Sequence, residues 1–201
     1  MAAAIDFYFD FSSPYGYFAA QKIEALAASH GRTVNWHPIL LGVVFKATGA
    51  APLPLVPLKG EYAYRDFERS ARFHGIEYRR PSRFPMATQA AARAMLWIAD
   101  QDGAARAVEF TKSVYRAYFV DDANISEPAV LAEIAGHLGF DGAALAEAIN
   151  SPAVKERLKA EVDEAMARKV FGSPFMIVDG EPFWGFDRFE QLEAFLRDGR
   201  I

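Results

Sequence analysis

Strand-like segments lie near the two ends of this 201-residue sequence, and a long helical stretch separates them. Residues 5–11 alternate apolar and polar side chains and are rich in aromatics, a pattern typical of a strand. Residues 33–41 predict a second strand, and the helical segment between the two strands closes at His30-Gly31. Because such a crossover favours parallel pairing, the chain is predicted to open with a βαβ unit.

The other end of the sequence predicts a hairpin followed by a helix. Two short apolar strands, at residues 174–178 and 182–184, flank Asp179-Gly180, which suits a two-residue turn, and residues 189–196 are helical. Together with the βαβ start, this ββα end predicts one α/β sheet domain that is completed only when both ends of the chain meet.

The middle of the chain predicts an all-helical insertion at residues 44–164, inside a sheet domain made of residues 1–43 and 165–201. Residues 50–58 are rich in proline and alanine without periodicity, which favours an ordered loop or lid over a site. Periodicity and capping residues then predict these helices: Tyr62–Phe73 ended by Gly75, Thr88–Asp100, Ala104–Tyr118, Glu127–His137 capped by Ser126, Gly142–Ile149 capped by Asp141, and a helix from Ser151-Pro152 to about Lys169.

The sequence contains no cysteine, which excludes disulfides, thiolate metal sites and dithiol redox chemistry from the protein's own side chains. Any sulfur chemistry must therefore come from a bound molecule. The start of the sequence lacks signal-peptide features, no apolar run reaches the ~20 residues of a membrane helix, and the formal charge of -4 argues against nucleic acid as a partner. A cytoplasmic protein with a small-molecule ligand is expected. The four histidines show no ligand spacing, so no metal is predicted.

The order βαβ, insertion, Pro-strand-turn-strand-helix resembles the thioredoxin fold over the whole chain. The Gly-Ser-Pro-Phe sequence of residues 172–175 stands where that fold has its cis-proline loop. Thioredoxin-like disulfide oxidoreductases have Cys-Pro-x-Cys after the first strand, whereas this chain has Ser-Pro-Tyr-Gly at residues 13–16. A lone Ser-Pro is most simply a helix cap, but its pairing with Ser173-Pro174 favours a functional role for Ser13.

Several short stretches share the pattern of one family: residues 6–11, 13–15, 40–42, 59–60, 170–174 and 184–188. On these stretches the chain resembles the 2-hydroxychromene-2-carboxylate isomerase family, close kin of the kappa-class glutathione transferases in the DsbA-like thioredoxin superfamily. The resemblance implies a glutathione-dependent isomerase of aromatic catabolism that interconverts 2-hydroxychromene-2-carboxylate and trans-o-hydroxybenzylidenepyruvate. It also implies a homodimer.

The resemblance further implies roles for the matching residues. Ser13 matches the catalytic serine, whose hydroxyl at a helix N-terminus would stabilise the glutathione thiolate. Ser173, before the cis-proline, would pair with the peptide-like part of glutathione. The implied glutathione-binding residues are Ser13, Lys59, Ser173, Pro174, Trp184, Gly185, Phe186, Asp187 and Arg188, and the implied substrate-binding residues are Phe45, Lys59 and Phe84.

Two positions depart from the family pattern, because Ala50 and Ala87 stand where the family often has asparagine. The exact substrate therefore stays open. Asp187 also suits a plain helix cap, and Lys59 also suits a solvated surface charge. Two other functions remain as alternatives: conjugation or peroxide reduction as in the kappa-class transferases, and a non-catalytic peptide-binding module that keeps the cis-proline groove.

Overall fold

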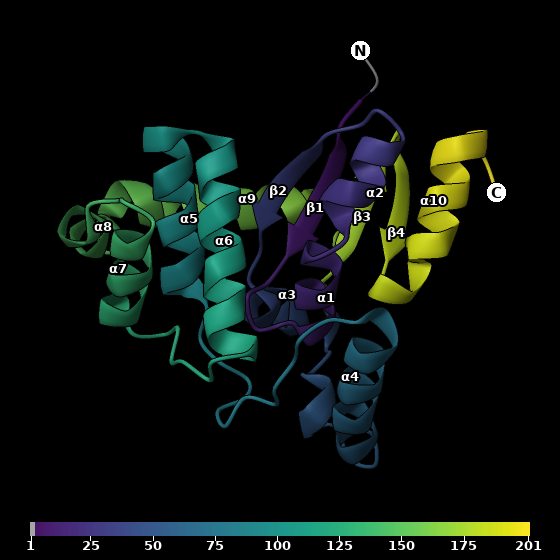
Figure 1. Ribbon diagram of the computed structural model, residues 1–201, viewed down its shortest axis with the longest axis horizontal. Coiled ribbons are helices and arrows are strands. Elements are labelled where there is room, and N and C mark those ends of the chain that lie inside the picture. The colour runs from purple at the N-terminus through teal and green to yellow at the C-terminus, as the bar shows by residue number, and fades with distance from the viewer. Residues whose placement is uncertain (1–2) are drawn as a thin grey trace.

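The computed structural model describes residues 3–201, and a four-stranded sheet lies at its centre (Figure 1). The strands are β1 (Ile5–Phe9), β2 (Val34–Pro38), β3 (Phe175–Val178) and β4 (Glu181–Trp184), in the spatial order β2-β1-β3-β4. β1 pairs in parallel with β2 and antiparallel with β3, and β3 pairs antiparallel with β4. The two ends of the chain thus build one sheet, as the sequence predicts.

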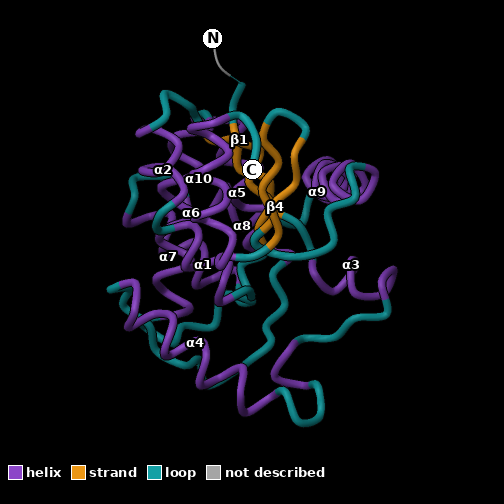
Figure 2. The backbone as a smooth tube through the Cα atoms, turned by 90° about the vertical axis from the view of Figure 1, so that its right-hand side faces the viewer, coloured by secondary structure: helices purple, strands orange, loops and turns teal. Residues whose placement is uncertain are grey.

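Helices cover both faces of this sheet, as Figure 2 shows, with α9 on one side of the strands and α2, α6 and α10 on the other. Side chains alternate accordingly: Phe7 and Phe9 enter the main core, whereas Tyr8 packs in a second core beside Ala165 of α9. The helices are α1 (Pro14–Ala20), α2 (Ile23–Ser29), α3 (Leu41–Thr48), α4 (Gly60–His74), α5 (Gln89–Asp102), α6 (Ala104–Phe119), α7 (Pro128–His137), α8 (Gly142–Ala148), α9 (Pro152–Ala167) and α10 (Phe189–Asp198), with 3-10 turns at Leu53–Leu55 and Phe186–Arg188.

Local signals fixed several boundaries correctly. Asp141 caps α8 by accepting hydrogen bonds from the amides of Ala143 and Ala144, each at 3.0 Å. The β3–β4 turn has φ 51° at Asp179 and φ 87° at Gly180, as expected where a two-residue hairpin turn needs two positive φ values.

Three predictions were wrong at the level of single elements. The helix expected to run unbroken to His30 is two helices, because the amides of Gln21 and Lys22 bond three residues back and tighten the chain into a turn. The strand expected over residues 33–41 ends at Pro38, and Leu41 begins α3. Ser126 does not cap α7, since its hydroxyl donates to Asn124 Oδ1 at 2.6 Å instead.

The helical block packs outward from the sheet in pairs. α5 packs against α6, and α7 packs against α8 further out (Figure 1). α9 contacts both α5 and β2, so the domain boundary expected at residue 164 falls within a helix that joins the block to the sheet. The division into two domains stays a prediction. Among residues 3–201, none of the helices combines the length and apolar character that a membrane span needs.

An ion pair fastens the hairpin turn to the other side of the sheet. Arg32 Nη1 and Nη2 donate to Asp179 Oδ1 and Oδ2 at 3.0 and 2.5 Å, and Arg32 also donates to the carbonyl of Ala3 at 2.7 Å. The hydrogen bonding from Arg32 outweighs the effect of burial and holds the pKa of Asp179 below its usual range. One guanidinium therefore ties three segments of the chain together at this end of the sheet.

We predict that Asp179→Asn lowers the free energy of unfolding by about 0.5–1 kcal/mol at pH 7, a small value because both side chains are partly exposed. A carboxylate whose folded pKa is depressed contributes stability above its unfolded pKa of ~3.9 and loses it as pH falls through the folded value. The difference between the two proteins should therefore vanish in strong acid. Urea unfolding at several pH values measures it.

Glu133→Gln on α7 is the matched control, since Glu133 is exposed and makes no ion pair with residues 3–201. It removes the same charge and should change stability little. A loss for Asp179→Asn that persists unchanged below pH 2 would contradict the ion-pair explanation.

Candidate active site

Ser13 and Ser173 lie 160 residues apart in the sequence and meet in the structure. Ser13 is the N-cap of α1, and its Oγ accepts a hydrogen bond from the Gly16 amide at 3.0 Å. The same hydroxyl donates to the carbonyl oxygen of Ser173 at 2.9 Å, and the Ser173–Pro174 peptide bond is cis. Only 4 % of Ser13 is exposed. The start of α1 is therefore held directly against the bend that precedes β3.

The Ser173 side chain and Gly16 complete this junction. Ser173 Oγ accepts a hydrogen bond from the Asp10 amide at 3.0 Å, so Ser173 is bound through both its side chain and its carbonyl. A Cβ at Gly16 would lie 2.7 Å from Ser173 Oγ and 3.0 Å from the hydroxyl of Tyr115. Only glycine permits this close approach of α1 to the cis-proline bend.

Asp10 lies behind Ser13 at the end of β1 and is almost fully buried. Its carboxylate accepts hydrogen bonds from the amides of Ser12 and Leu41, each at 2.7 Å, and from the Thr88 side chain. Burial raises the pKa of Asp10, and these three donors oppose that rise. Its backbone carbonyl accepts from Tyr115 Oη at 3.0 Å. Asp10 thus connects β1, α1, α3, α5 and α6.

A second connection joins the Ser13 loop to the segment after α4. Ser12 Oγ accepts a hydrogen bond from the Met86 amide at 3.1 Å, which brings the Phe84–Met86 segment beside the site. Phe84 is half-buried and its ring lies 6.5 Å from that of Phe67 in α4. The resemblance assigned Phe84 to the substrate side. In the structure Phe84 lies two residues before Met86, whose amide bonds to Ser12 beside Ser13.

Tyr15 joins α1 to α4. Its hydroxyl donates to the Asp66 carboxylate, and its ring lies 5.0 Å from that of Phe67. Burial, together with the Asp66 carboxylate, raises the pKa of Tyr15 far above its usual range, so the hydroxyl stays protonated as a donor. These contacts therefore fix α4 to α1, the helix that Ser13 caps.

On the other side of the cis-proline bend, the end of β4 exposes an aromatic surface. Trp184 is 55 % exposed and packs edge-on against Phe171, with ring centroids 4.9 Å apart. Gly172 lies directly beneath the indole, where a Cβ would be 2.2 Å from Trp184 Nε1. The Gly185 amide donates to the Pro174 carbonyl at 3.0 Å, which joins this surface to the bend.

The last predicted binding residues differ in what they present to solvent. Phe186 is buried and packs on Phe18 and His74, so its side chain belongs to the core and only its backbone can face a ligand. Asp187 and Arg188 are exposed and pair with each other at 2.9 Å. A ligand with both an ammonium and a carboxylate offers each of them a complementary charge.

Lys59 and Phe45 are the candidates that the structure does not join to Ser13. Lys59 is exposed at the start of α4 and forms no ion pair with residues 3–201, and Phe45 is half-buried in α3. Ala50 and Ala87, the two departures from the family pattern, are both exposed. Ala50 lies on the α3–α4 connection and Ala87 on the α4–α5 connection.

Sequence reasoning missed Asp10, Gly16, Tyr115 and Phe171. Gly16 carried a usable signal, because a glycine in the first turn of a helix is unfavourable unless a close approach requires it. Asp10 carried a weaker one, a carboxylate at the end of an apolar strand. Tyr115 carried no local signal, since its contact with Asp10 spans 105 residues.

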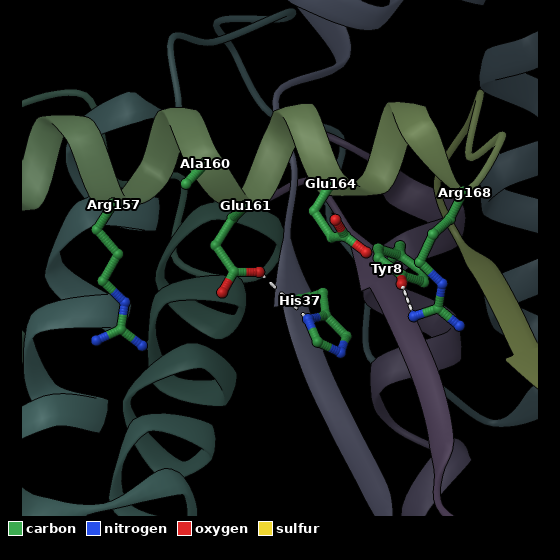
Figure 3. Close-up of a pocket in the computed structure, with 7 residues that line it drawn as sticks. All are labelled: Tyr8, His37, Arg157, Ala160, Glu161, Glu164 and Arg168. Atoms are coloured by element: carbon green, nitrogen blue, oxygen red, sulfur yellow. Dashed lines mark hydrogen bonds and ion pairs between the residues drawn. The ribbon is translucent and has the colours of Figure 1, made fainter.

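A hollow of about 370 Å³ lies on the opposite face of the sheet, between α9 and the first two strands (Figure 3). His37 Nδ1 lies 3.2 Å from Glu161 Oε2, and Arg168 donates to the hydroxyl of Tyr8. Neither Ser13 nor Ser173 lines this hollow. Its polar groups pair with one another and with Asp6 and Asp100, as expected for contacts that fasten α9 to the sheet and to α5. Within residues 3–201, no three acidic or histidine side chains group as metal ligands.

Comparison with known proteins agrees with this architecture. The family model for the DSBA-like thioredoxin domain matches residues 4–197. The 2-hydroxychromene-2-carboxylate isomerase of Pseudomonas putida is 32% identical over 94% of this chain and 92% of its own length. Glutathione s-transferase kappa 2 of Caenorhabditis elegans is 27% identical over 96% of this chain and 92% of its own length.

A known crystal structure is similar over nearly the whole chain. The SeMet structure of a 2-hydroxychromene-2-carboxylate isomerase superposes with a TM-score of 0.87 at 28% identity, covering 96% of this chain and 94% of that one. The thioredoxin-like fold with a helical insertion is thereby confirmed. The chain is an enzyme of the isomerase class, and it belongs to the DSBA-like thioredoxin domain family and, within it, to the 2-hydroxychromene-2-carboxylate isomerases.

Proposed function

We propose that this protein is a glutathione-dependent cis–trans isomerase that interconverts 2-hydroxychromene-2-carboxylate and trans-o-hydroxybenzylidenepyruvate. The observation that carries the proposal is the 2.9 Å hydrogen bond from Ser13 Oγ to the Ser173 carbonyl, which places a helix-capping hydroxyl against a cis-proline bend. In a chain with no cysteine, this junction suits a thiol that arrives on a ligand.

The residues around the junction fit glutathione chemically. Ser173 is half-buried, so its backbone offers an edge where an extended tripeptide can pair. Gly16 and Gly172 let the side chains of Ser173 and Trp184 pack directly on the backbone, which shapes the surface beside Ser13 and below the indole. At the far end, Asp187 and Arg188 carry the charges that complement an α-amino acid. A tripeptide with a γ-glutamyl end therefore matches the order of groups along this surface.

Ser13 would act as a hydrogen-bond donor. Glutathione, when bound, supplies a nucleophilic sulfur for reversible addition to an α,β-unsaturated substrate, which permits rotation about the former double bond. The Ser13 hydroxyl donates to the Ser173 carbonyl, and rotation about its Cα–Cβ bond or its C–O bond redirects that donor toward a neighbouring anion. Such a donor favours the ionised thiol.

The substrate side would be formed by aromatic and basic residues of the helical insertion. Phe84 is held near Ser13 through Met86, and Phe45 and Lys59 lie on α3 and at the start of α4. An aromatic carboxylate needs an apolar wall and a cation, and these three residues provide both. Because alanines stand at positions 50 and 87, the polar contacts to the substrate would be fewer than the family pattern offers.

The kappa-class alternative is favoured by the 27% identity to glutathione s-transferase kappa 2. Both functions would use the same Ser13 junction but differ in their use of glutathione. Turnover of 2-hydroxychromene-2-carboxylate, measured with and without glutathione, tests the proposal. We expect product only with glutathione and no net consumption of the thiol, whereas stoichiometric loss of the thiol would indicate a transferase. The homodimer and the cytoplasmic location stay predictions.

We predict that Ser13→Ala raises the thiol pKa of bound glutathione toward about 8.5, the value of a free cysteine thiol, because the thiolate loses its donor. The rate of isomerisation at pH 7 should fall at least about tenfold. Ultraviolet absorbance of the thiolate as a function of pH, with turnover measured on the same samples, checks both effects.

Ser151→Ala provides a matched control. Ser151 also precedes a proline and caps a helix, since its Oγ accepts from the Val154 amide at 3.3 Å, but it lies at the start of α9. Each substitution should cost about 1 kcal/mol of stability through loss of the cap. Only the Ser13 variant should lose activity. Equal activity losses in the two variants, or an unchanged thiol pKa in Ser13→Ala, would remove Ser13 from the mechanism.

We also predict that Gly16→Ala weakens glutathione binding at least about tenfold, because the new methyl group would force Ser173 and Tyr115 away from α1. Gly136→Ala on α7 is the control. It adds the same methyl group where no heavy atom lies within 4 Å, and it should stabilise its helix by about 0.5–1 kcal/mol. Isothermal calorimetry with glutathione measures the affinity of each variant. Equal affinities would contradict the prediction, because they would show that glutathione binding does not need the close approach of α1 to the cis-proline bend.

A further inference from the structure

A cavity of about 420 Å³ lies in the helical insertion, between α5, the start of α7 and the connection from α8 to α9. Neither Ser13 nor Ser173 lines it, and no acidic residue does. Its polar lining comes from Gln89, Arg93, Ser126 and Asn150, beside apolar surface from Pro128 and Ile149. The cavity is therefore separate from the Ser13 junction and carries one positive charge.

Arg93 is the charged residue in the lining of this cavity. Its side chain is half-buried, and its Nε is fully enclosed with no hydrogen-bond partner among residues 3–201. No carboxylate of those residues pairs with its guanidinium, although most other arginines of the chain form ion pairs. A guanidinium cannot lose its charge, and a buried N–H without an acceptor is destabilising. Arg93 thus brings to the cavity wall a cation that no carboxylate among residues 3–201 pairs with.

The polar groups around Arg93 are neutral side chains that can both donate and accept hydrogen bonds. Gln89 has an exposed amide, and the Asn150 amide makes only a long contact of 3.4 Å with the Ala146 carbonyl. Thr88, the N-cap residue of α5, bonds to Asp10 and does not cap the helix with its side chain, so the free amides of the first turn of α5 add positive potential. Glu127, next to the lining residues Ser126 and Pro128 in the sequence, is exposed and accepts from Asn124 at 3.2 Å.

We propose that this cavity binds a small, singly charged carboxylate with an apolar body, at a site separate from the one that would hold glutathione. One guanidinium beside neutral amides balances one negative charge, so a carboxylate fits better than a phosphate dianion. Pro128, Ile149 and the methyl group of Ala90 offer apolar contact to the remainder of the ligand.

The position of the cavity links it to the proposed active site through one short segment. Ala87 belongs to the cavity wall, while its neighbours Met86 and Thr88 bond to Ser12 and Asp10 behind the Ser13 loop. A carboxylate bound at Arg93 therefore contacts the same segment that supports Ser13. The proposal concerns binding alone and holds whether or not the protein uses glutathione.

The test is a titration of the full chain with sodium benzoate, followed by two-dimensional ¹H–¹⁵N NMR. Benzamide, the neutral isostere, and inorganic phosphate are run at equal ionic strength. We expect saturable shifts at Arg93 Nε–Hε and at the amides of Gln89 and Ala90, with a Kd of about 1–10 mM. Benzamide should produce none, and phosphate should bind more weakly than benzoate.

Gln89→Glu is the variant that tests the charge without endangering the fold. An acidic residue in the first turn stabilises a helix, yet here it would compete with the ligand for Arg93. Benzoate affinity should fall about tenfold or more, whereas Gln89→Ala should change it little. Arg93→Gln should abolish binding.

Each contrary result overturns the proposal. Shifts that do not saturate, or equal shifts with benzamide, would show that no anion site exists. Shifts confined to the amides of Ser13 and Gly16 would place benzoate in the proposed active site instead. Tighter binding of phosphate would refute the assignment to a carboxylate, and unchanged affinity in Gln89→Glu would remove Arg93 as the binding group.

Discussion

The hydrogen bonds of Asp10 are the constraint on which the rest of the site depends. Its buried carboxylate is tolerable only because the Ser12 and Leu41 amides and the Thr88 side chain donate to it. Its backbone amide meanwhile holds Ser173 Oγ, which fixes the cis-proline bend relative to β1. Because one residue supplies all these bonds, the starts of α1, α3 and α5 are positioned together and meet β3 at a single point.

This arrangement explains how a sheet with such short strands can hold a precise site. β1 has five residues and β3 has four, so strand pairing alone leaves the loops at their ends weakly determined. The Ser13 hydroxyl and the Ser173 side chain add two bonds across the junction, and Gly16 permits the approach they require. Side-chain bonds at the strand ends thus supply the order that the short strands cannot.

Much of the fold followed from local patterns, since alternation, helical periodicity and turn chemistry are properties of neighbouring residues. The Asp179-Gly180 turn and the Asp141 cap are examples. The start of α3 did not follow, because its first amide is bound by Asp10, 31 residues earlier. Ser13 and Ser173 were expected to meet from their places in the expected fold, and they do. Tyr115 acts through a bond to Asp10 across 105 residues, which no local pattern reveals.

The surroundings of Ser13 favour a hydrogen-bond donor over a nucleophile. A nucleophilic serine needs an adjacent base to take its proton, yet the partners of Ser13 Oγ among residues 3–201 are the Gly16 amide and the Ser173 carbonyl. The carboxylate oxygens of Asp10 accept hydrogen bonds from the Ser12 and Leu41 amides and the Thr88 side chain, and neither oxygen bonds to the Ser13 hydroxyl. With no such base beside the serine and no cysteine in the chain, the proposed mechanism assigns the reactive atom to a ligand, whose charge the capping hydroxyl would stabilise.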